Sequence, residues 1–276
     1  MRRRRMKVSV LTDEISEDPA TAIELASGWG IRHVEIRSLF GKRVPDEDPD
    51  VRKILVDSMS AHDVDVAAIT PGLFKVPLTD RERIDRHLAD RLPKSIEFAN
   101  AVGTDVIILF TPVLIDGPDE KAMSYFRDVL VKALDIAEKE AVTLALENEP
   151  ICYTATGSST SKFVRDLNRQ DLRVNWDPGN AYFAGEDALE GYRHVRDLVA
   201  HVHLKDCVTD RLTGAKGYVP IGQGEVGLEE QVRLLKEDRY LGHLTIETHF
   251  GPKVKGTKEC LDGLRAILSR LGEGLE

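Results

Sequence analysis

Short apolar segments recur along the chain, and each is followed by a segment whose apolar residues return at helical spacing. In residues 119–140, for example, Met123, Phe126, Leu130 and Leu134 recur every three or four positions, as on the buried face of an amphipathic helix. The short segments have the length and composition of buried strands. The pattern predicts strands at 7–11, 33–36, 64–69, 105–110, 142–146, 172–176, 201–204 and 244–246, and helices at 18–29, 51–61, 79–102, 119–140, 161–167, 189–197, 228–236 and 257–271.

The strict alternation of strands and helices predicts an α/β fold with a parallel sheet and right-handed crossovers. Eight strand–helix units in 276 residues favour closure into a (β/α)₈ TIM barrel. An open dinucleotide-binding sheet would normally begin with a glycine-rich turn, whereas the first turn here, TDEISEDP at 12–19, contains no glycine. No Ser/Gly/Pro-rich linker divides the chain, so we expect a single barrel domain over residues 7–276.

Glycine and proline predict where several elements end. Pro71 and Gly72 should stop the third strand, and Pro93 should kink or break the helix of 79–102. Residues 205–227 are predicted to form a long loop. Its glycine-rich segment GQGEV (222–226) lacks the lysine of a phosphate-binding loop and is interpreted as a turn over the site.

Composition narrows the class of partner. The 38 Lys and Arg residues against 47 Asp and Glu residues give a net charge of −9, which argues against a nucleic-acid partner. The three cysteines are far apart and are interpreted as reduced thiols, as in a cytoplasmic protein. No apolar run is long enough for a membrane span or a secretory signal. The basic start, residues 1–6 with Arg2 to Arg5, is expected to be a solvated, mobile end.

The chemistry-bearing residues gather at the ends of the last four strands. Glu147, Asp177 and Glu247 directly follow apolar strand segments, and His203 lies on the seventh strand. Active sites of barrels lie at the carboxyl ends of the strands, so these four side chains should converge. Alone, each has a plain structural interpretation as a helix cap, an arginine partner or a core histidine. Together they would repel unless a cation lay between them, which predicts a divalent metal, Mn²⁺ or Mg²⁺ first, with Co²⁺ and Zn²⁺ as alternatives.

Five motifs carry a resemblance to a known family. They are LALENEP at 144–150, NWDPGN at 175–180, HVHLKD at 201–206, PIGQGEV at 220–226 and TIETH at 245–249. With them the sequence resembles the sugar phosphate isomerase/epimerase family of xylose isomerase-like barrels, a superfamily that also holds ketose 3-epimerases, inosose dehydratases and endonuclease IV. The motifs cover the carboxyl half well, and the amino half matches mainly through TDEIS and the strand order.

The resemblance implies a role for each of the four residues. It makes Glu147, Asp177, His203 and Glu247 the ligands of one divalent metal ion, with Mn²⁺ the first choice, and makes Glu147 and Glu247 the catalytic acid/base pair. The implied reaction is proton abstraction next to the carbonyl of a small sugar, through a metal-stabilised enediolate, giving an epimer or an isomer. Positioned acid–base groups contribute roughly 10²–10⁴-fold to such reactions.

Further residues are candidates for substrate binding. Asn180 stands where family members often carry a histidine, and it can bind a hydroxyl but cannot shuttle a proton near neutrality. Lys205 shares a strand face with His203, so it either reaches a substrate oxygen or pairs with Glu247 or Asp177. The remaining candidates are Glu35, Lys75, His249 and Arg211, the last only if the loop after the seventh strand is longer than in the epimerases. Glu149 is either a partner behind the ligands or a substrate contact, and His201 is interpreted as a buried core group or a partner of the ligands.

Several functions remain open from the sequence. A dehydratase acting on a keto-cyclitol or dehydroshikimate-like substrate shares the first proton abstraction and is the main alternative. A sugar-binding barrel without activity would be expected to lack one of the four ligands, yet all four are present. An endonuclease IV-like enzyme would need more histidines at the site and a basic face. The predicted partner is therefore a small sugar or cyclitol, without nucleic acid or membrane, and a homodimer is an option.

Overall fold

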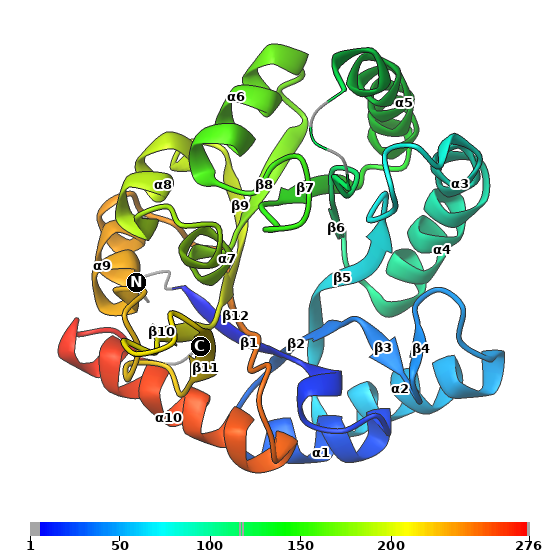
Figure 1. The fold of residues 1–276 in the computed structure, drawn as a ribbon. Helices are drawn as coiled ribbons and strands as arrows, with labels where there is room; N and C mark the ends of the chain where they lie inside the picture. Colours follow the sequence, from blue (N-terminus) through cyan, green and yellow to red (C-terminus); the bar gives the residue numbers. More distant parts are fainter. Residues whose placement is uncertain (1–5, 116, 118, 275–276) are drawn as a thin grey trace.

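The barrel predicted from the sequence is present. The computed structural model describes residues 6–115, 117 and 119–274, so Arg2 to Arg5 lie outside the described residues. Eight strands form a closed barrel in the order β1-β12-β9-β8-β7-β6-β5-β2, and every neighbouring pair is parallel (Figure 1). The strands are β1 (Lys7–Leu11), β2 (His33–Ile36), β5 (Asp65–Leu73), β6 (Val106–Leu109), β7 (Thr143–Glu147), β8 (Leu172–Trp176), β9 (Val199–Leu204) and β12 (His243–Ile246).

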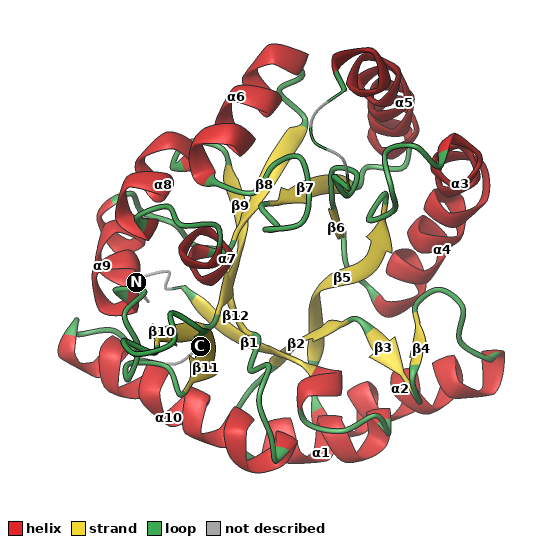
Figure 2. Cartoon of the chain, viewed as in Figure 1, coloured by secondary structure: helices red, strands yellow, loops and turns green. Residues whose placement is uncertain are grey.

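Helices surround the barrel on its outer side (Figure 2). They are α1 (Pro19–Gly28), α2 (Pro49–His62), α3 (Arg81–Arg86), α4 (Leu92–Val102), α5 (Glu120–Lys139), α6 (Gly157–Leu167), α8 (Ala188–Val195), α9 (Leu228–Glu237) and α10 (Lys253–Arg270). A short helix, α7 (Pro178–Phe183), and the turn η1 (Thr12–Glu14) follow the carboxyl ends of β8 and β1. Among the described residues, no helix is both long enough and apolar enough to cross a bilayer.

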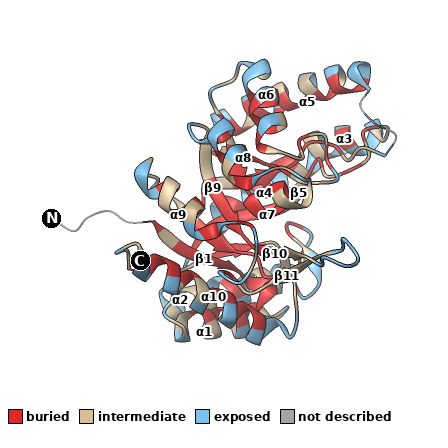
Figure 3. Cartoon of the chain, turned by 60° about the vertical axis from the view of Figure 1, so that its left-hand side comes forward, coloured by how far each residue is buried: buried red, intermediate tan, exposed pale blue. Residues whose placement is uncertain are grey.

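Local sequence signals explain where the helices start. Asp18 accepts a hydrogen bond from the Ala20 amide and is followed by Pro19, as expected of a helix N-terminus. Helix α6 begins four residues earlier than the apolar periodicity suggested, because Thr156 and Ser159 form a capping box. The core lies between the outward faces of the strands and the inward faces of the helices, and the strands are largely buried (Figure 3).

Two segments differ from the sequence-based prediction, and the break predicted near Pro93 is present. Strand β5 continues to Leu73 through Pro71 and Gly72, because an irregularity in its pairing with β6 between Ile69 and Leu73 accommodates them. The helix predicted over 79–102 is divided into α3, a π-helical turn (His87–Arg91) and α4, which has Pro93 in its first turn. Met6, assigned to the mobile end, is buried.

The predicted loop 205–227 contains a hairpin, β10 (Asp206–Thr209) and β11 (Lys216–Val219). Asp206 explains how the following segment is held. One of its carboxylate oxygens accepts hydrogen bonds from the amides of Gly222 and Gly224, at 2.8 and 3.0 Å. Gly224 must be a glycine here, because an added Cβ would lie 2.1 Å from the Asp206 carboxylate. The GQGEV segment is therefore fixed to the end of β9. A second small hairpin, β3 (Ser38–Leu39) and β4 (Lys42–Arg43), follows β2.

Candidate active site

The four predicted ligands converge at the carboxyl end of the barrel. Glu147 ends β7, Asp177 follows β8, His203 lies on β9 and Glu247 follows β12. One potential ligand atom from each lies within 4.8 Å of those of the others. All four side chains are buried, with exposed fractions between 0% and 6%. The parallel barrel brings these strand ends together although the residues are far apart in the sequence.

His203 is oriented from below by Glu35. The Nε2 atom of His203 lies 3.0 Å from each Glu35 carboxylate oxygen, and the Thr70 hydroxyl also donates to Glu35. The other ring nitrogen, Nδ1, has no hydrogen-bond partner in the described part of the chain. It faces Oε2 of Glu147 at 3.4 Å and Oε2 of Glu247 at 3.7 Å. Burial alone would lower the pKa of His203, but Glu35 and Glu147 outweigh it and raise this pKa well above its ordinary value.

Amide side chains fix the other ligands. Asn175 donates to Oε2 of Glu147 at 3.0 Å, and Asn180 donates to Oε1 of Glu147 at 3.0 Å. Asn148 bonds both to the backbone carbonyl of Asp177 and to its amide, at 2.8 and 2.9 Å. Oδ1 of Asp177 caps α7 by accepting a hydrogen bond from the backbone N–H of Asn180. These bonds leave the carboxylates little freedom, as expected of a preorganised site.

Lys205 pairs with the cluster. Its ammonium lies 2.7 Å from Oδ2 of Asp177 and 2.7 Å from Oε2 of Glu247. Of the two roles considered from the sequence, the structure shows the ion pair. Burial would lower the pKa of Lys205, but Asp177 and Glu247 raise it well above its ordinary value. For Glu247 the directions are reversed: burial would raise its pKa, but Lys205, His249 and His203 lower it well below its usual range.

Arg37 is a central residue that the sequence reasoning missed. Its guanidinium lies 2.9 Å from Asp13, 2.6 Å from Glu14 and 2.7 Å from Oε1 of Glu247. It thereby ties the ends of β1 and β2 to the end of β12. A charged residue directly after the apolar strand 33–36 was the available signal, because that position lies at the barrel mouth.

A cavity of about 200 Å³ opens above the cluster. Six of the predicted site residues line it: Glu147, Asn180, Lys205, Lys75, Glu247 and His249. Sequence reasoning did not single out other lining residues, which are Arg37, Arg43, Thr70, Phe110 and Tyr218. Lys75 pairs with Glu149, which also lines the cavity, at 2.7 Å, and Nε2 of His249 lies 3.0 Å from Oε1 of Glu247.

Two predicted substrate-binding residues lie elsewhere. Glu35 is fully buried and uses both oxygens for His201, His203 and Thr70, so its position favours orienting the imidazoles over binding a substrate hydroxyl. Arg211 lies in the exposed turn between β10 and β11 and does not line the cavity. The chain forms a hairpin here, and this carries Arg211 outward. His201 is buried and contacts Glu35, in agreement with its interpretation as a core group.

The cluster fits a divalent cation. Nδ1 of His203 is buried and has no hydrogen-bond partner among the described residues, while Oδ2 of Asp177 is paired with the Lys205 ammonium. Three carboxylates and one imidazole form a mixed oxygen and nitrogen donor set, which suits a hard or borderline metal. The bond from Nε2 of His203 to Glu35 is the second-sphere contact typical of a metal-binding histidine.

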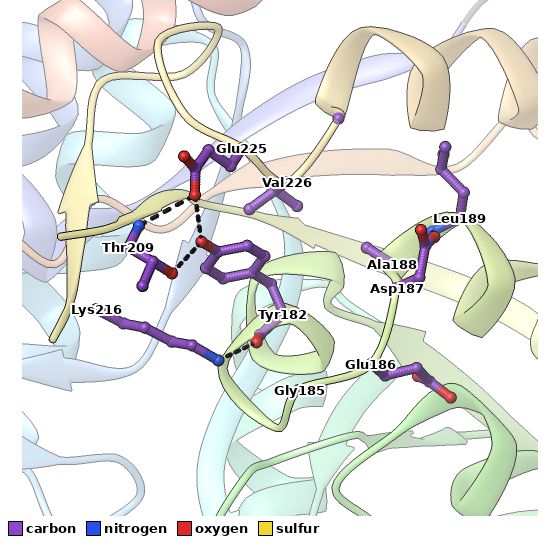
Figure 4. A pocket seen from close by; sticks show the side chains of 11 residues that line it. Tyr182, Gly185, Glu186, Asp187, Ala188, Leu189, Thr209, Lys216, Glu225 and Val226 are labelled. Atoms are coloured by element: carbon purple, nitrogen blue, oxygen red, sulfur yellow. Dashed lines mark hydrogen bonds between the residues drawn. The ribbon is translucent and has the colours of Figure 1, made fainter. Parts of the chain in front are cut away.

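A second cavity, of about 370 Å³, lies beside α7 and α8 (Figure 4). Its polar groups bond to one another. The Tyr182 hydroxyl donates to Glu225, which also accepts from the Thr209 amide, and the Lys216 ammonium donates to the carbonyl of Tyr182. Because these groups are already satisfied, this cavity presents no cluster comparable to that at the barrel mouth.

Comparison with known proteins identifies the family of the barrel. The family model described as "Xylose isomerase-like TIM barrel" matches residues 23–267. The chain belongs to this family.

Relatives within the family have different activities. Inosose dehydratase of Clostridium perfringens is 22% identical over 83% of this chain and 84% of its own length. L-ribulose-5-phosphate 3-epimerase of Shigella flexneri is 29% identical over 65% of this chain and 63% of its own length. Among solved structures, the IolI protein with a bound zinc atom superposes with a TM-score of 0.78 at 20% identity, covering 96% of this chain and 99% of that one. At this identity the structural likeness establishes the fold.

Proposed function

We propose that the protein is a divalent-metal-dependent enzyme that isomerises or epimerises a small sugar or sugar derivative. The observation that carries the proposal is the cluster of Glu147, Asp177, His203 and Glu247, whose ligand atoms lie within 4.8 Å of one another. The cluster lies under a cavity lined by groups that bind hydroxyls and carbonyls. The epimerase and dehydratase relatives support an enzyme over a barrel that only binds sugar.

The metal would be held by the four residues of the cluster. When bound, it would polarise the substrate carbonyl and so make the neighbouring carbon more acidic. The zinc atom in the IolI structure supports a divalent ion, and the donor set leads us to propose Mn²⁺ first. Glu35 is hydrogen-bonded to Nε2 of His203, which leaves Nδ1 as the nitrogen that would bind the metal.

Glu147 and Glu247 are the proposed acid/base pair. Glu147 ends β7 and Glu247 follows β12, and these strands are separated in the barrel by β8 and β9, so the two carboxylates reach the cavity from different sides. One carboxylate takes the proton next to the carbonyl to give an enediolate. The other, which starts as the protonated acid, donates its proton to the opposite face of that carbon, giving an epimer. Alternatively it donates to the adjacent carbon while a proton moves between the two oxygens of the enediolate, giving an isomer. Arg37, Lys205 and His249 stabilise the ionised form of Glu247.

The substrate hydroxyls would bind to side chains on the cavity wall that are neutral or already part of an ion pair. Asn180 already donates to Glu147 and has its carbonyl oxygen available as an acceptor. Lys75 and His249 line the same cavity and contribute donors. Binding through several fixed polar groups would orient the reacting carbon between the two glutamates.

A dehydratase is the second candidate, and the inosose dehydratase relative favours it by covering 83% of this chain. Both reactions begin with the same proton abstraction. They differ in whether the enediolate is reprotonated or expels a hydroxyl from the neighbouring carbon.

Proton NMR in heavy water tests the proposal and separates the two candidates. The metal-loaded protein, with Mg²⁺ in place of paramagnetic Mn²⁺, is incubated with ketopentoses, ketohexoses and keto-inositols. We expect solvent deuterium at a carbon beside the carbonyl in at least one of them. An epimer or isomer as product supports the first candidate, and an absorbing enone or diketone supports the second. Absence of exchange across the panel with metal bound would contradict both.

A further inference from the structure

Among the residues that the structure describes, one arginine on the cavity wall forms no ion pair. Arg43 lies on β4, in the hairpin after β2, and lines the cavity. It is half-buried, and its one hydrogen bond is a long contact of 3.5 Å from Nη1 to the carbonyl oxygen of Thr70. Within the described ranges it has no ion-pair partner.

The other cations on this wall are already paired. Arg37 contacts three carboxylates, and Lys205 contacts two. Lys75 pairs with Glu149, and His249 pairs with Glu247. Arg43 is therefore the one cation on the described cavity wall without an ion pair.

The backbone is shaped to receive this side chain. Gly72 has a φ of +74°, and a Cβ built on it would lie 2.8 Å from Nη1 and 3.2 Å from Cδ of Arg43. The bare glycine therefore leaves room for the guanidinium at the end of β5. The glycine thus allows the unpaired Arg43 side chain to lie against the backbone at the cavity, which indicates that this position of the guanidinium is part of the site.

The unpaired state is costly, which points to a missing partner. Burial, and then the neighbouring Arg37, lower the pKa of Arg43 and outweigh Asp13 and Glu147, which raise it, so the net effect disfavours its charge. A guanidinium nevertheless stays protonated at neutral pH. Half-buried charges are normally matched by an opposite charge, and the planar guanidinium fits carboxylates and phosphates through paired hydrogen bonds.

We propose that Arg43 binds an anionic group, a carboxylate or a phosphate, on the substrate of this site. The inference rests on the proposed function for the location of the reacting carbon and adds the substrate class, an acidic sugar derivative. The anionic group lies toward β2 and β5, while the carbonyl lies toward the cluster on β7, β8, β9 and β12.

Matched substrate pairs test the inference. Ribulose 5-phosphate is compared with ribulose, and fructuronate with fructose, because each pair differs at the group that carries the charge. Binding is measured by calorimetry and deuterium exchange by NMR, on the metal-loaded wild type, Arg43→Gln and Arg43→Lys. Arg86→Gln, an exposed arginine on α3 that pairs with Glu82, is the matched control.

We expect the wild type and Arg86→Gln to prefer the anionic member of one pair by about 10-fold or more in affinity, the range of a charged hydrogen bond. Arg43→Gln should reduce this ratio toward one, and Arg43→Lys should retain part of it. The pair that shows the preference identifies carboxylate or phosphate. Equal affinity within both pairs, or a ratio that persists in Arg43→Gln, would overturn the inference. Folding of each variant is checked by its thermal transition.

The two readouts separate this inference from the proposed function. Arginine-dependent preference in binding without any deuterium exchange would support the anion site and contradict the proposed enolisation. Exchange with equal affinity for charged and neutral partners would support enolisation and contradict the anion site. Inorganic phosphate alone, titrated into wild type and Arg43→Gln, adds a check that needs no turnover, and binding that is equal in the two proteins counts against Arg43.

Discussion

The two sides of the barrel mouth carry opposite chemistry. On the side of β7, β8, β9 and β12, three carboxylates and a histidine crowd within 4.8 Å and are held by Asn175, Asn180 and Lys205. On the side of β2 and β5, the lining residues are Arg37, Arg43, Thr70 and Lys75, with no carboxylate among them. The first, acidic side is organised to hold a cation. The second, basic side presents cationic side chains to the cavity.

This difference shows how one cavity can position a small molecule. A carbonyl or hydroxyl is drawn to the acidic side if a metal lies there, and a negatively charged group is drawn to the basic side. The two attractions act at opposite ends of the same molecule and therefore fix its orientation as well as its affinity. Variants on each side should consequently fail in different ways.

The largest expected effect is on the acidic side. Glu247→Gln removes a proposed metal ligand and base while keeping the side chain's shape, so turnover should fall by about 10²–10⁴-fold with the fold retained. Turnover is measured by deuterium exchange, and the fold by circular dichroism. Glu259→Gln, an exposed glutamate on α10, is the control. Unchanged turnover in Glu247→Gln would contradict the proposed site.

Metal removal should come next. If the ion binds the folded protein alone, saturating it at about 100 to 1,000 times its Kd stabilises the fold by about 2.7–4.1 kcal/mol. Dialysis against a chelator should therefore lower Tm by several degrees and abolish exchange, and adding Mn²⁺ should restore both. A Tm that does not respond to any of Mn²⁺, Mg²⁺, Co²⁺ and Zn²⁺ would count against the metal site.

A substitution at Glu35 tests whether its contact with His203 contributes to metal binding on the acidic side. Glu35→Gln keeps a hydrogen bond to His203 but removes the charge, so metal affinity should fall by about 10–100-fold. Calorimetric titration of Mn²⁺ measures the change. Glu24→Gln, on the exposed face of α1, should bind as the wild type does. Equal affinity in both variants would show that Glu35 does not act through His203.

The smallest expected effect is on the pH dependence of stability, through His87 in the π-helical turn after β5. Nδ1 of His87 accepts a hydrogen bond from the Phe74 amide at 2.8 Å. Burial, together with Arg91, Arg83 and Arg86, lowers the pKa of His87 to about 4. The unfolded chain takes up this proton below about pH 6.5, whereas the folded chain resists it until about pH 4, so stability is present above the unfolded pKa and is lost as pH falls.

His87→Gln removes this titration. Between pH 6.5 and 4 the wild type should lose about 1–2 kcal/mol more stability than the variant, allowing for the partial exposure of the ring. Urea unfolding at several pH values measures the difference. Parallel pH profiles for the two proteins would show that His87 is not held neutral by the fold.

The predicted and missed residues differ in a consistent way. Glu147, Asp177, His203 and Glu247 were found from the sequence because each lies at the end of a regular strand, and parallel strands in a barrel end at one mouth. Arg43 was missed because it lies in the irregular hairpin after β2, where no periodicity fixes the direction of a side chain. Arg37 directly follows β2 and was overlooked although its place at a strand end was the available signal. Arg211, a conditional candidate, does not line the cavity, because it lies in the exposed turn of the β10–β11 hairpin.

The depth of a side chain in the barrel was also beyond the sequence. Glu35 alternates correctly into the interior of the barrel, but its partners depend on the register between β2 and strands far along the chain. The structure pairs Glu35 with Leu11 on β1 and Ala68 on β5, and this places its carboxylate at His201 and His203 rather than in the cavity. Register follows from closure and tilt of the whole barrel.

The sequence by itself determined the alternation of strands and helices, the single barrel and the four residues of the cluster, because apolar periodicity and strand ends are local properties of the chain. The tertiary structure decided which charges meet. It turned Lys205 toward Asp177 and Glu247 and joined Arg37 to three carboxylates, and it left Arg43 on the cavity wall without an ion pair among the described residues. Ion pairing depends on distances between segments remote in sequence, and only the closed barrel sets those distances.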